Sequence, residues 1–240
     1  MSPSLHIHVL SLAPAWMDLW FQSGIWRSAI QKNALAITQY HLRDFGIGPH
    51  SQVDSPAFGG GGGMLLRVDA LAAAVTYIRN RTTPHRLYVI ALDPKGTRFT
   101  ANWVNHFLAP GHPKHILLVC GRYEGMDARF EAYIDTSLSV GDFVVSGGEL
   151  GALLITDALL RQAPGTFGRK DAATHESFHF HDPQGEPLLE YPQYTHPVEY
   201  NGLTVPPVLR SGNHLRIADW RQKHMRNATP PGWEIPPLPT

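Results

Sequence analysis

Two nearly unbroken apolar runs constrain the fold of this 240-residue chain more than any other feature. Residues 86–92 read RLYVIAL, and residues 115–120 read HILLVC. Such runs are typical of strands that are covered on both faces, as in parallel sheets. Segments with helical spacing lie at 65–80, before the first run, and at 99–109, between the two. The alternation predicts an α/β domain built around a parallel sheet.

The rest of the chain divides into a regular part and a turn-rich part. Apolar periodicity persists to about residue 162 and then fades into glycine, proline, histidine and acidic residues. We therefore predict a first domain at 1–165, an interdomain loop at 166–190 and a short C-terminal domain at 191–240. The other expected elements are a strand at 5–10 and helices at 14–34, 149–162 and 213–226.

The composition excludes several classes of protein. Hydrophobic residues make up 43% of the chain and charged residues 17%, a balance unlike that of disordered chains. No apolar stretch approaches the ~18 residues of a membrane span, and the N-terminus lacks the pattern of a signal peptide. The single cysteine, Cys120, cannot form a disulfide framework, which fits a reducing compartment. We expect a soluble, cytoplasmic protein with no membrane partner.

Three predicted strand ends carry unusual sequence. The first run is followed by DPKG, the second by GRYEGMD at 121–127, and residues 139–150 read SVGDFVVSGGEL. In an open parallel sheet, ligands bind at the carboxyl ends of the strands, and glycine there lets the main chain approach a ligand. The dinucleotide fingerprint and the phosphate loop are both absent. These features predict a nucleotide-like ligand held mainly by the main chain, other than NAD or ATP.

The same motifs resemble those of the bacterial tRNA (guanine-N1)-methyltransferase family, of the TrmD type. GRYEGMD and SVGDFVVSGGEL carry the resemblance, which extends from about Leu5 to Trp220. It implies a SPOUT fold, in which a deep trefoil knot at about 86–160 lies inside an α/β domain, followed by a small helical C-terminal domain. General topology rules would exclude such a knot. The further matching segments are GGGGGM at 59–64, LLEYPQYTHP at 188–197 and VPPVLRSGNH at 205–214.

The resemblance implies the reaction and the cofactor. Members of the family methylate N1 of the guanosine at position 37 of tRNA, with S-adenosylmethionine bound in the knot. They form homodimers whose active sites are shared across the interface. The reaction is reported to depend on Mg²⁺, and the sequence shows no site for that ion. The positions that match the family's cofactor site are Leu92, Asp93, Pro94, Gly121, Tyr123, Glu124, Ser139, Val140, Gly141, Asp142, Phe143, Val144, Val145, Gly147 and Gly148.

Guanine N1 carries a proton that must leave as the methyl group arrives, and a carboxylate is a suitable base. Glu176 stands where the family has its catalytic aspartate, and Glu190 matches a second acidic position. Glutamate is longer by one methylene, and a displacement of ~1 Å can cost ~100-fold in rate. Arg161 matches a family arginine that stabilises negative charge on guanine O6. From the sequence alone, Arg161 reads instead as an ion-pair partner of Asp157 on a helix face.

The run of glycines in FGGGGGM at 58–64 has two readings. Glycine-rich stretches usually behave as flexible linkers. This one lies inside the predicted α/β domain, just before a helix, and the resemblance implies that it approaches the target base. We therefore expect Gly59, Gly60 and Gly61 to be ordered and to admit a purine against the main chain.

The C-terminal part supplies the expected tRNA contacts. Asn213, His214, Arg216 and Arg221 match family positions, and basic side chains there would meet phosphates. The histidine pairs His6/His8 and His179/His181 suggest metal only weakly, because no third or fourth ligand has diagnostic spacing. We therefore predict no metal site.

Two other functions remain open. The altered base position and the short basic C-terminus would suit a catalytically impaired RNA-binding protein with the same fold. A SPOUT methyltransferase that acts on ribosomal RNA would also retain the cofactor motifs. Methyl transfer to a tRNA, to an rRNA or to neither separates the three.

Overall fold

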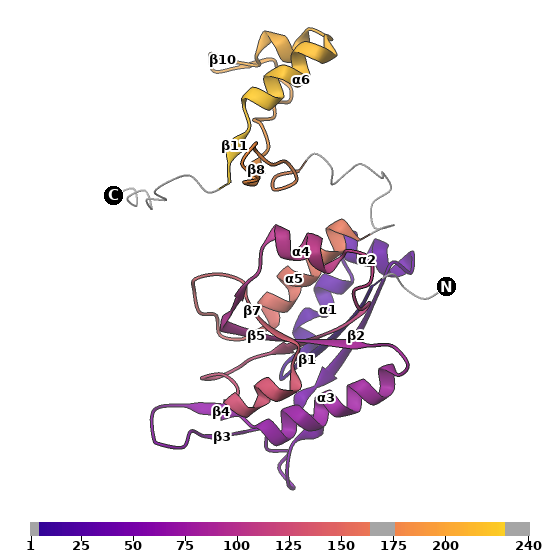
Figure 1. The fold of residues 1–240 in the computed structure, drawn as a ribbon, viewed down its shortest axis with the longest axis vertical. Helices are drawn as coiled ribbons and strands as arrows, with labels where there is room; N and C mark the ends of the chain where they lie inside the picture. The colour runs from indigo at the N-terminus through magenta and orange to yellow at the C-terminus, as the bar shows by residue number, and fades with distance from the viewer. Residues whose placement is uncertain (1–4, 164–175, 229–240) are drawn as a thin grey trace. The chain divides into compact units, whose positions relative to one another are not determined.

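The computed structural model describes residues 5–163 and 176–228, and its internal contacts divide the chain into two units, Met1–Gly168 and Arg169–Thr240. In the first unit, five parallel strands form one sheet in the order β2-β1-β6-β5-β7 (Figure 1). The predicted α/β class with a parallel sheet is therefore confirmed. The strands are β1 (Leu5–Ser11), β2 (Leu35–His41), β5 (Leu87–Arg98), β6 (His115–Cys120) and β7 (Thr136–Ser139).

Helices cover both faces of this sheet, with α3 on one side and α2, α4 and α5 on the other (Figure 1). A short antiparallel hairpin, β3 (Asp54–Pro56) and β4 (Met64–Leu66), precedes α3. The helices are α1 (Asp18–Phe21), α2 (Gly24–Gln31), α3 (Val68–Thr82), α4 (Ala101–Phe107) and α5 (Glu149–Gln162). Short 3₁₀ helices lie at η1 (Pro14–Met17), η2 (Leu42–Phe45) and η3 (Ala128–Tyr133).

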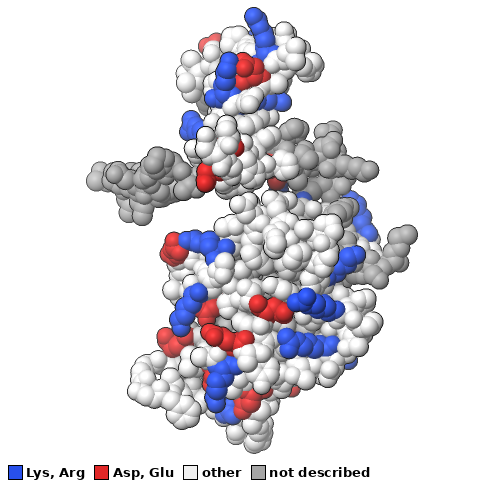
Figure 2. Space-filling view, viewed as in Figure 1, with Lys and Arg blue, Asp and Glu red and all other residues white. Residues whose placement is uncertain are grey.

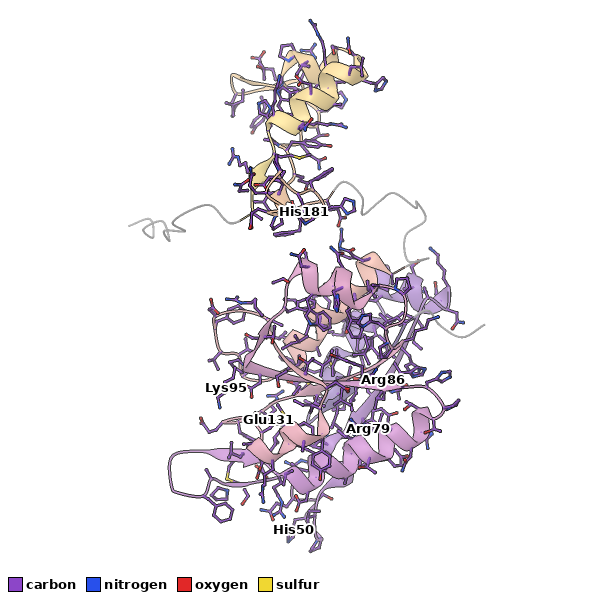
Figure 3. The ribbon with its side chains drawn as sticks, viewed as in Figure 1. His50, Arg79, Arg86, Lys95, Glu131 and His181 are labelled. Atoms are coloured by element: carbon purple, nitrogen blue, oxygen red, sulfur yellow. The ribbon has the colours of Figure 1, made fainter. Side chains whose placement is uncertain are left out.

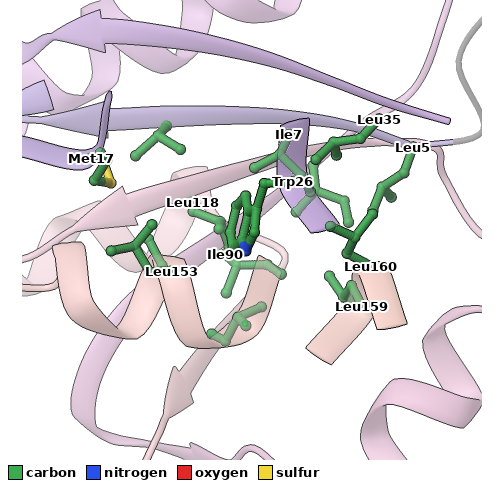
Figure 4. Packing of buried hydrophobic residues seen from close by; sticks show 14 of the residues in the cluster. Leu5, Ile7, Met17, Trp26, Leu35, Ile90, Leu118, Leu153, Leu159 and Leu160 are labelled. Atoms are coloured by element: carbon green, nitrogen blue, oxygen red, sulfur yellow. The ribbon is translucent and has the colours of Figure 1, made fainter. Parts of the chain in front are cut away.

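Each face of the sheet has its own apolar core. Ile7 and Leu118 from the sheet pack against Trp26 of α2 and Leu159 of α5 on one face (Figure 4). The opposite face packs against α3. Because side chains alternate along a strand, the neighbours of these core residues on β1 and β6 point to the α3 side. The two cores explain why β6 lacks a polar face, whereas β1 places His6 and His8 on the α3 side.

The structure differs from the predicted elements in three places. The helix expected at 14–34 is broken, since Gly24 has a φ of +51°, a left-handed conformation outside the helical region. The strand expected to end at Leu92 continues to Arg98, with an irregularity between two paired stretches. The strand β7 is short and polar, and β2 mixes polar and apolar residues, so both lack the apolar run that identifies β5 and β6.

The second unit contains one α-helix among its described residues, α6 (His214–Lys223), after a 3₁₀ turn, η4 (Pro207–Arg210). Asn213 caps α6, because its side chain accepts a hydrogen bond from the Arg216 amide at 3.1 Å. Two short antiparallel pairs, which the sequence did not predict, join β8 to β11 and β9 to β10. These strands are β8 (Leu188–Leu189), β9 (Glu199–Tyr200), β10 (Leu203–Thr204) and β11 (Arg226–Asn227).

The face of the molecule that Figure 2 shows has no strong charge bias. Acidic and basic side chains are interspersed over the visible face of the first unit (Figure 2), in keeping with a formal net charge of +0. Among the described helices, none has the length and apolar character needed to cross a bilayer.

Candidate active site

A cavity of about 340 Å³ lies at the carboxyl ends of β5, β6 and β7, where ligands bind in open parallel sheets. Its volume falls within the range of small-molecule sites. All but one of the positions predicted to bind the cofactor line it. They are Leu92, Asp93, Pro94, Gly121, Tyr123, Glu124, Ser139, Val140, Gly141, Phe143, Val144, Val145, Gly147 and Gly148.

Asp142 is the predicted cofactor residue that does not line the cavity. Its side chain is exposed and forms an ion pair with Arg98 at the end of β5. Lys95, Arg122, Gly125, Leu138, Ser146 and Gly151 line the cavity although the sequence did not single them out as ligand-binding positions. Lys95 is labelled in Figure 3. Arg122 and Gly125 lie inside GRYEGMD, so the motif could have identified both as cavity residues.

Two glycines bring separate segments into direct contact at the cavity. A Cβ atom on Gly148 would lie 2.7 Å from the Cα of Cys120, so only glycine fits at the start of α5. The Gly148 amide also donates a hydrogen bond to the Gly121 carbonyl at 2.9 Å. At the other side, a Cβ on Gly96 would lie 2.6 Å from the Leu138 amide nitrogen. At Gly148 the wall of the cavity is thus main chain packed on main chain, and Gly96 makes a second such contact next to the lining residue Lys95.

A buried ion pair fixes the base of this arrangement. Glu149, the first residue of α5, is 0% exposed and accepts a hydrogen bond from the Ser11 hydroxyl at 2.5 Å. Arg122 donates from Nε to Glu149 Oε1 at 3.2 Å, and its other nitrogen lies 3.1 Å from Oε2. The pair connects the loop after β6 to the start of α5 and the end of β1. Glu149 lies outside the predicted set, although it is part of SVGDFVVSGGEL.

The loop after β6 is held in an uncommon conformation. Tyr123 has a φ of +59°, which non-glycine residues rarely adopt and which often marks a functional site. The next residue, Glu124, is exposed at the cavity, and its amide donates to the Met64 carbonyl at 3.0 Å. This bond attaches the predicted cofactor loop to the end of the glycine-rich segment.

The glycine-rich segment forms the connection between β3 and β4, inside the first unit and not at a domain boundary. Gly59, Gly60 and Gly61 have φ values of +88°, +82° and +115°, so the main chain there suits only glycine. A Cβ on any of these three would meet no atom within 4 Å. Conformation, and not crowding by the described residues, therefore accounts for glycine at these positions.

The two candidate bases lie in one small substructure of the second unit. Glu176 begins a short turn whose Phe178 amide donates to the Leu188 carbonyl at 2.7 Å. The Glu190 amide donates to the Ser177 hydroxyl oxygen at 3.1 Å, and its carboxylate accepts from Gln193 at 2.7 Å. Hydrogen bonds thus hold the two predicted acids in neighbouring segments.

Arg161 is exposed in the last turn of α5. The alternative reading paired it with Asp157, one turn earlier on the same helix. The Asp157 carboxylate accepts a hydrogen bond from the Trp26 indole at 2.9 Å, which directs it toward α2.

The predicted tRNA contacts gather on α6 and its cap. Asn213, His214 and Arg216 are exposed in its first turn. Arg221 lies one to two turns later, with its guanidinium 4.9 Å from the centre of the Tyr191 ring. This arrangement places a planar cation over an aromatic face, a surface suited to bases as well as phosphates.

Cys120 lies directly beneath the cavity and is fully buried. Burial first, and then the nearby Glu149 carboxylate, raise the pKa of its thiol well above the ordinary value. The thiol therefore stays protonated at neutral pH. A nucleophilic cysteine mechanism is excluded at this position, since the thiolate is the reactive form.

Comparison with known proteins supplies the family. The family model described as tRNA (Guanine-1)-methyltransferase TrmD matches residues 5–231. A tRNA (guanine-N(1)-)-methyltransferase of Myxococcus xanthus is 39% identical over 92% of this chain and 86% of its own. The Listeria innocua protein of that name is 34% identical over 94% of this chain and 89% of its own.

A solved structure agrees with these relatives. The crystal structure of tRNA (m1G37) methyltransferase from Aquifex aeolicus superimposes with a TM-score of 0.73 at 32% identity. The alignment covers 93% of this chain and 89% of that one. Sequence and fold therefore agree over nearly the whole length, including the motifs that form the cavity. The chain belongs to the TrmD family of tRNA (guanine-1)-methyltransferases.

Proposed function

We propose that this protein transfers a methyl group from S-adenosylmethionine to N1 of the guanosine at position 37 of tRNA. The observation that carries the proposal is the main-chain cavity at the ends of β5, β6 and β7, lined by the family's motifs. Its chemistry suits this cofactor. Main-chain groups of 139–145 can read an adenine, Leu138 and Val140 offer apolar walls, and the Glu124 carboxylate can accept from a hydroxyl or amine.

The remaining chemistry falls to side chains of this chain. S-adenosylmethionine, when bound, supplies an electrophilic methyl group. We assign Glu176 as the base that accepts the N1 proton while the new N–C bond forms, with Glu190 as the second candidate. The Arg161 guanidinium stabilises the negative charge that develops on guanine O6. The glycine-rich segment ends beside Glu124, at Gly63 and Met64, and we assign Gly59–Gly61 as the part that admits the purine.

A methyl-transfer assay tests the reaction and the base together. With labelled S-adenosylmethionine, we expect transfer to a tRNA transcript with guanosine at position 37 and none when adenosine replaces it. Glu176→Gln should lower the single-turnover rate by roughly 100-fold or more, with cofactor affinity unchanged, since the amide cannot take the proton. The matched control is Glu186→Gln, an exposed acid in the same segment, which should keep the full rate.

The outcomes separate the alternatives. If Glu176→Gln kept the full rate of methyl transfer and Glu190→Gln were slow, Glu190 would be the base. Cofactor binding without transfer to any RNA would favour a catalytically impaired RNA-binding protein. Methyl transfer to ribosomal RNA alone would favour an rRNA methyltransferase. Either of the last two results would overturn the proposed function.

We further propose that α6 contacts tRNA phosphates through Arg216 and Arg221, with Asn213 and His214 beside them. Arg221→Ala should weaken tRNA binding and reduce the slope of log K against log salt by about one, because one phosphate contact is lost. Filter binding at several salt concentrations measures both quantities. Asp219→Ala removes an acid from the same helix and should not weaken binding; an unchanged salt slope in Arg221→Ala would contradict the assignment.

The homodimer and the knot are also proposals. Large apolar side chains remain exposed on η1, α1 and α5: Trp16, Leu19, Trp20, Leu150 and Leu154. Since η1 and α5 are in contact, these residues support a common interface in a homodimer. Analytical ultracentrifugation measures the mass of the assembly and tests this proposal. The close main-chain contacts at Gly96 and Gly148 support a trefoil knot, which a crystallographic chain trace tests. A dependence on Mg²⁺ rests on the family resemblance alone.

A further inference from the structure

Three histidines come together under the C-terminal half of α3, away from the cavity. His6 and His8 alternate on β1 and therefore point to the same face of the sheet. His115 begins β6 and is directly opposite His6 in the parallel register. One ring nitrogen from each lies within 4.8 Å of the other two. The prediction of no metal site rested on the lack of a third or fourth ligand at diagnostic spacing in the sequence. The sheet brings His115 beside His6 and His8 without such spacing.

We propose that His6, His8 and His115 bind a divalent transition-metal ion, with Zn²⁺ as the first candidate. At Zn–N distances of about 2.0–2.1 Å, two nitrogen ligands at the tetrahedral angle lie about 3.3 Å apart. His8 Nε2 and His115 Nδ1 are already 3.2 Å apart. The ligand nitrogen of His6 lies within 4.8 Å of both, so it must move closer to them when the ion binds. Water completes the fourth position, because the three histidines leave it open.

The surroundings favour the ligand form of each ring. Burial lowers the pKa of all three histidines, and that of His8 falls to about 3, with His6 and His115 adding to the effect. Burial thus favours the neutral ring, which is the form that binds metal.

Hydroxyl groups and one further ring complete the surroundings of the cluster. Thr38 Oγ1 lies 2.9 Å from His6 Nε2, and the Tyr40 hydroxyl lies 3.4 Å from His8 Nδ1. Groups of this kind orient ligand rings in metal sites. His85 stacks on His115 with ring centroids 4.8 Å apart and restricts its rotation.

An all-imidazole set selects the metal by its chemistry. Imidazole suits Zn²⁺, Cu²⁺ and Ni²⁺, whereas Mg²⁺ demands oxygen ligands in octahedral geometry. The site is therefore distinct from any Mg²⁺ requirement of methyl transfer. It also lies at the amino ends of β1 and β6, opposite the end that forms the cavity. A bound ion would tie these two strands together and stabilise the fold without entering the reaction.

The test uses the full-length protein without a histidine tag, stripped with a chelator. Titration with Zn²⁺ against a chromogenic chelator should show one tight equivalent per chain. At ~100-fold excess over the dissociation constant, Tm should rise by about 5–10 °C. His115→Asn should lose both the tight equivalent and the Tm rise. The matched control is His50→Asn, an exposed histidine at the far end of the same unit (Figure 3), which should retain both.

A second measurement keeps the test decisive if His115→Asn fails to fold. Co²⁺ added to the wild-type protein should give the visible absorption of tetrahedral nitrogen coordination, and Zn²⁺ should displace it. No tight equivalent in the wild-type protein, or an equivalent that persists in a folded His115→Asn variant, would overturn the proposal. Activity is not needed as a readout, so failure of this site and failure of the methyl-transfer proposal are independent results.

Discussion

Replacing Glu149 with alanine is expected to lower the free energy of unfolding by about 3–5 kcal/mol, or Tm by roughly 6–20 °C. The carboxylate is fully buried, and its loss leaves the Arg122 charge without its partner and the Ser11 hydroxyl without its acceptor. The same change should weaken binding of S-adenosylmethionine, because Arg122 lines the cavity and is positioned by this pair. Denaturant unfolding and calorimetric titration measure the two effects.

The control for this prediction is an exposed ion pair. Asp219 and Lys223 pair on α6 at 2.9 Å with more than half of each side chain exposed. Asp219→Ala should change stability by no more than about 0.5 kcal/mol. If Glu149→Ala changed the free energy of unfolding as little, water could replace the carboxylate. The ion pair between Arg122 and Glu149 would then not hold the cavity together.

The second large effect is expected for Gly148→Ala. Gly148 has a φ of −70°, so alanine can adopt the conformation, and the obstacle is space alone. The new methyl group would lie 2.7 Å from Cys120 Cα and 2.9 Å from the Gly121 amide nitrogen. Because both atoms are main chain, the segments must separate by an ångström or so. We expect about 1–3 kcal/mol of destabilisation and roughly 100-fold weaker cofactor binding.

Gly62→Ala is the matched control for Gly148→Ala. A Cβ at Gly62 would meet no atom within 4 Å, and its φ lies outside the left-handed range. Tm and cofactor affinity of this variant should therefore stay near wild type. A Gly148→Ala variant that binds S-adenosylmethionine normally would show that the two segments can move apart without cost.

The sequence predicted the parts of this structure that depend on local pattern. The runs at 86–92 and 115–120 became β5 and β6, and residues at the ends of both runs line one cavity. Short polar strands such as β7 were not predicted, because pairing with β5, and not their own composition, makes them strands. The break at Gly24 was also missed, since a single glycine inside an apolar period is compatible with a helix.

Contacts between distant segments account for the rest. Glu149 and Ser11 are hydrogen-bonded although most of the first unit separates them in the sequence. No spacing in the sequence predicts that pair. His115 joins His6 and His8 only because β6 lies next to β1 in the sheet order. The resemblance to a known family supplied the expected knot and the candidate base. Periodicity carries no information on how a chain threads through itself.

The glycines that line the cavity affect how mutations could give resistance to an inhibitor bound there. Six of the twenty residues that line it are glycines: Gly121, Gly125, Gly141, Gly147, Gly148 and Gly151. A competitive inhibitor seated there would contact main chain at these six positions, where no side chain is present to change. Substitutions at the crowded glycines would distort the pocket for the natural ligand as well. Resistance would therefore arise more readily at the lining positions that carry side chains, or outside the pocket, than at these glycines.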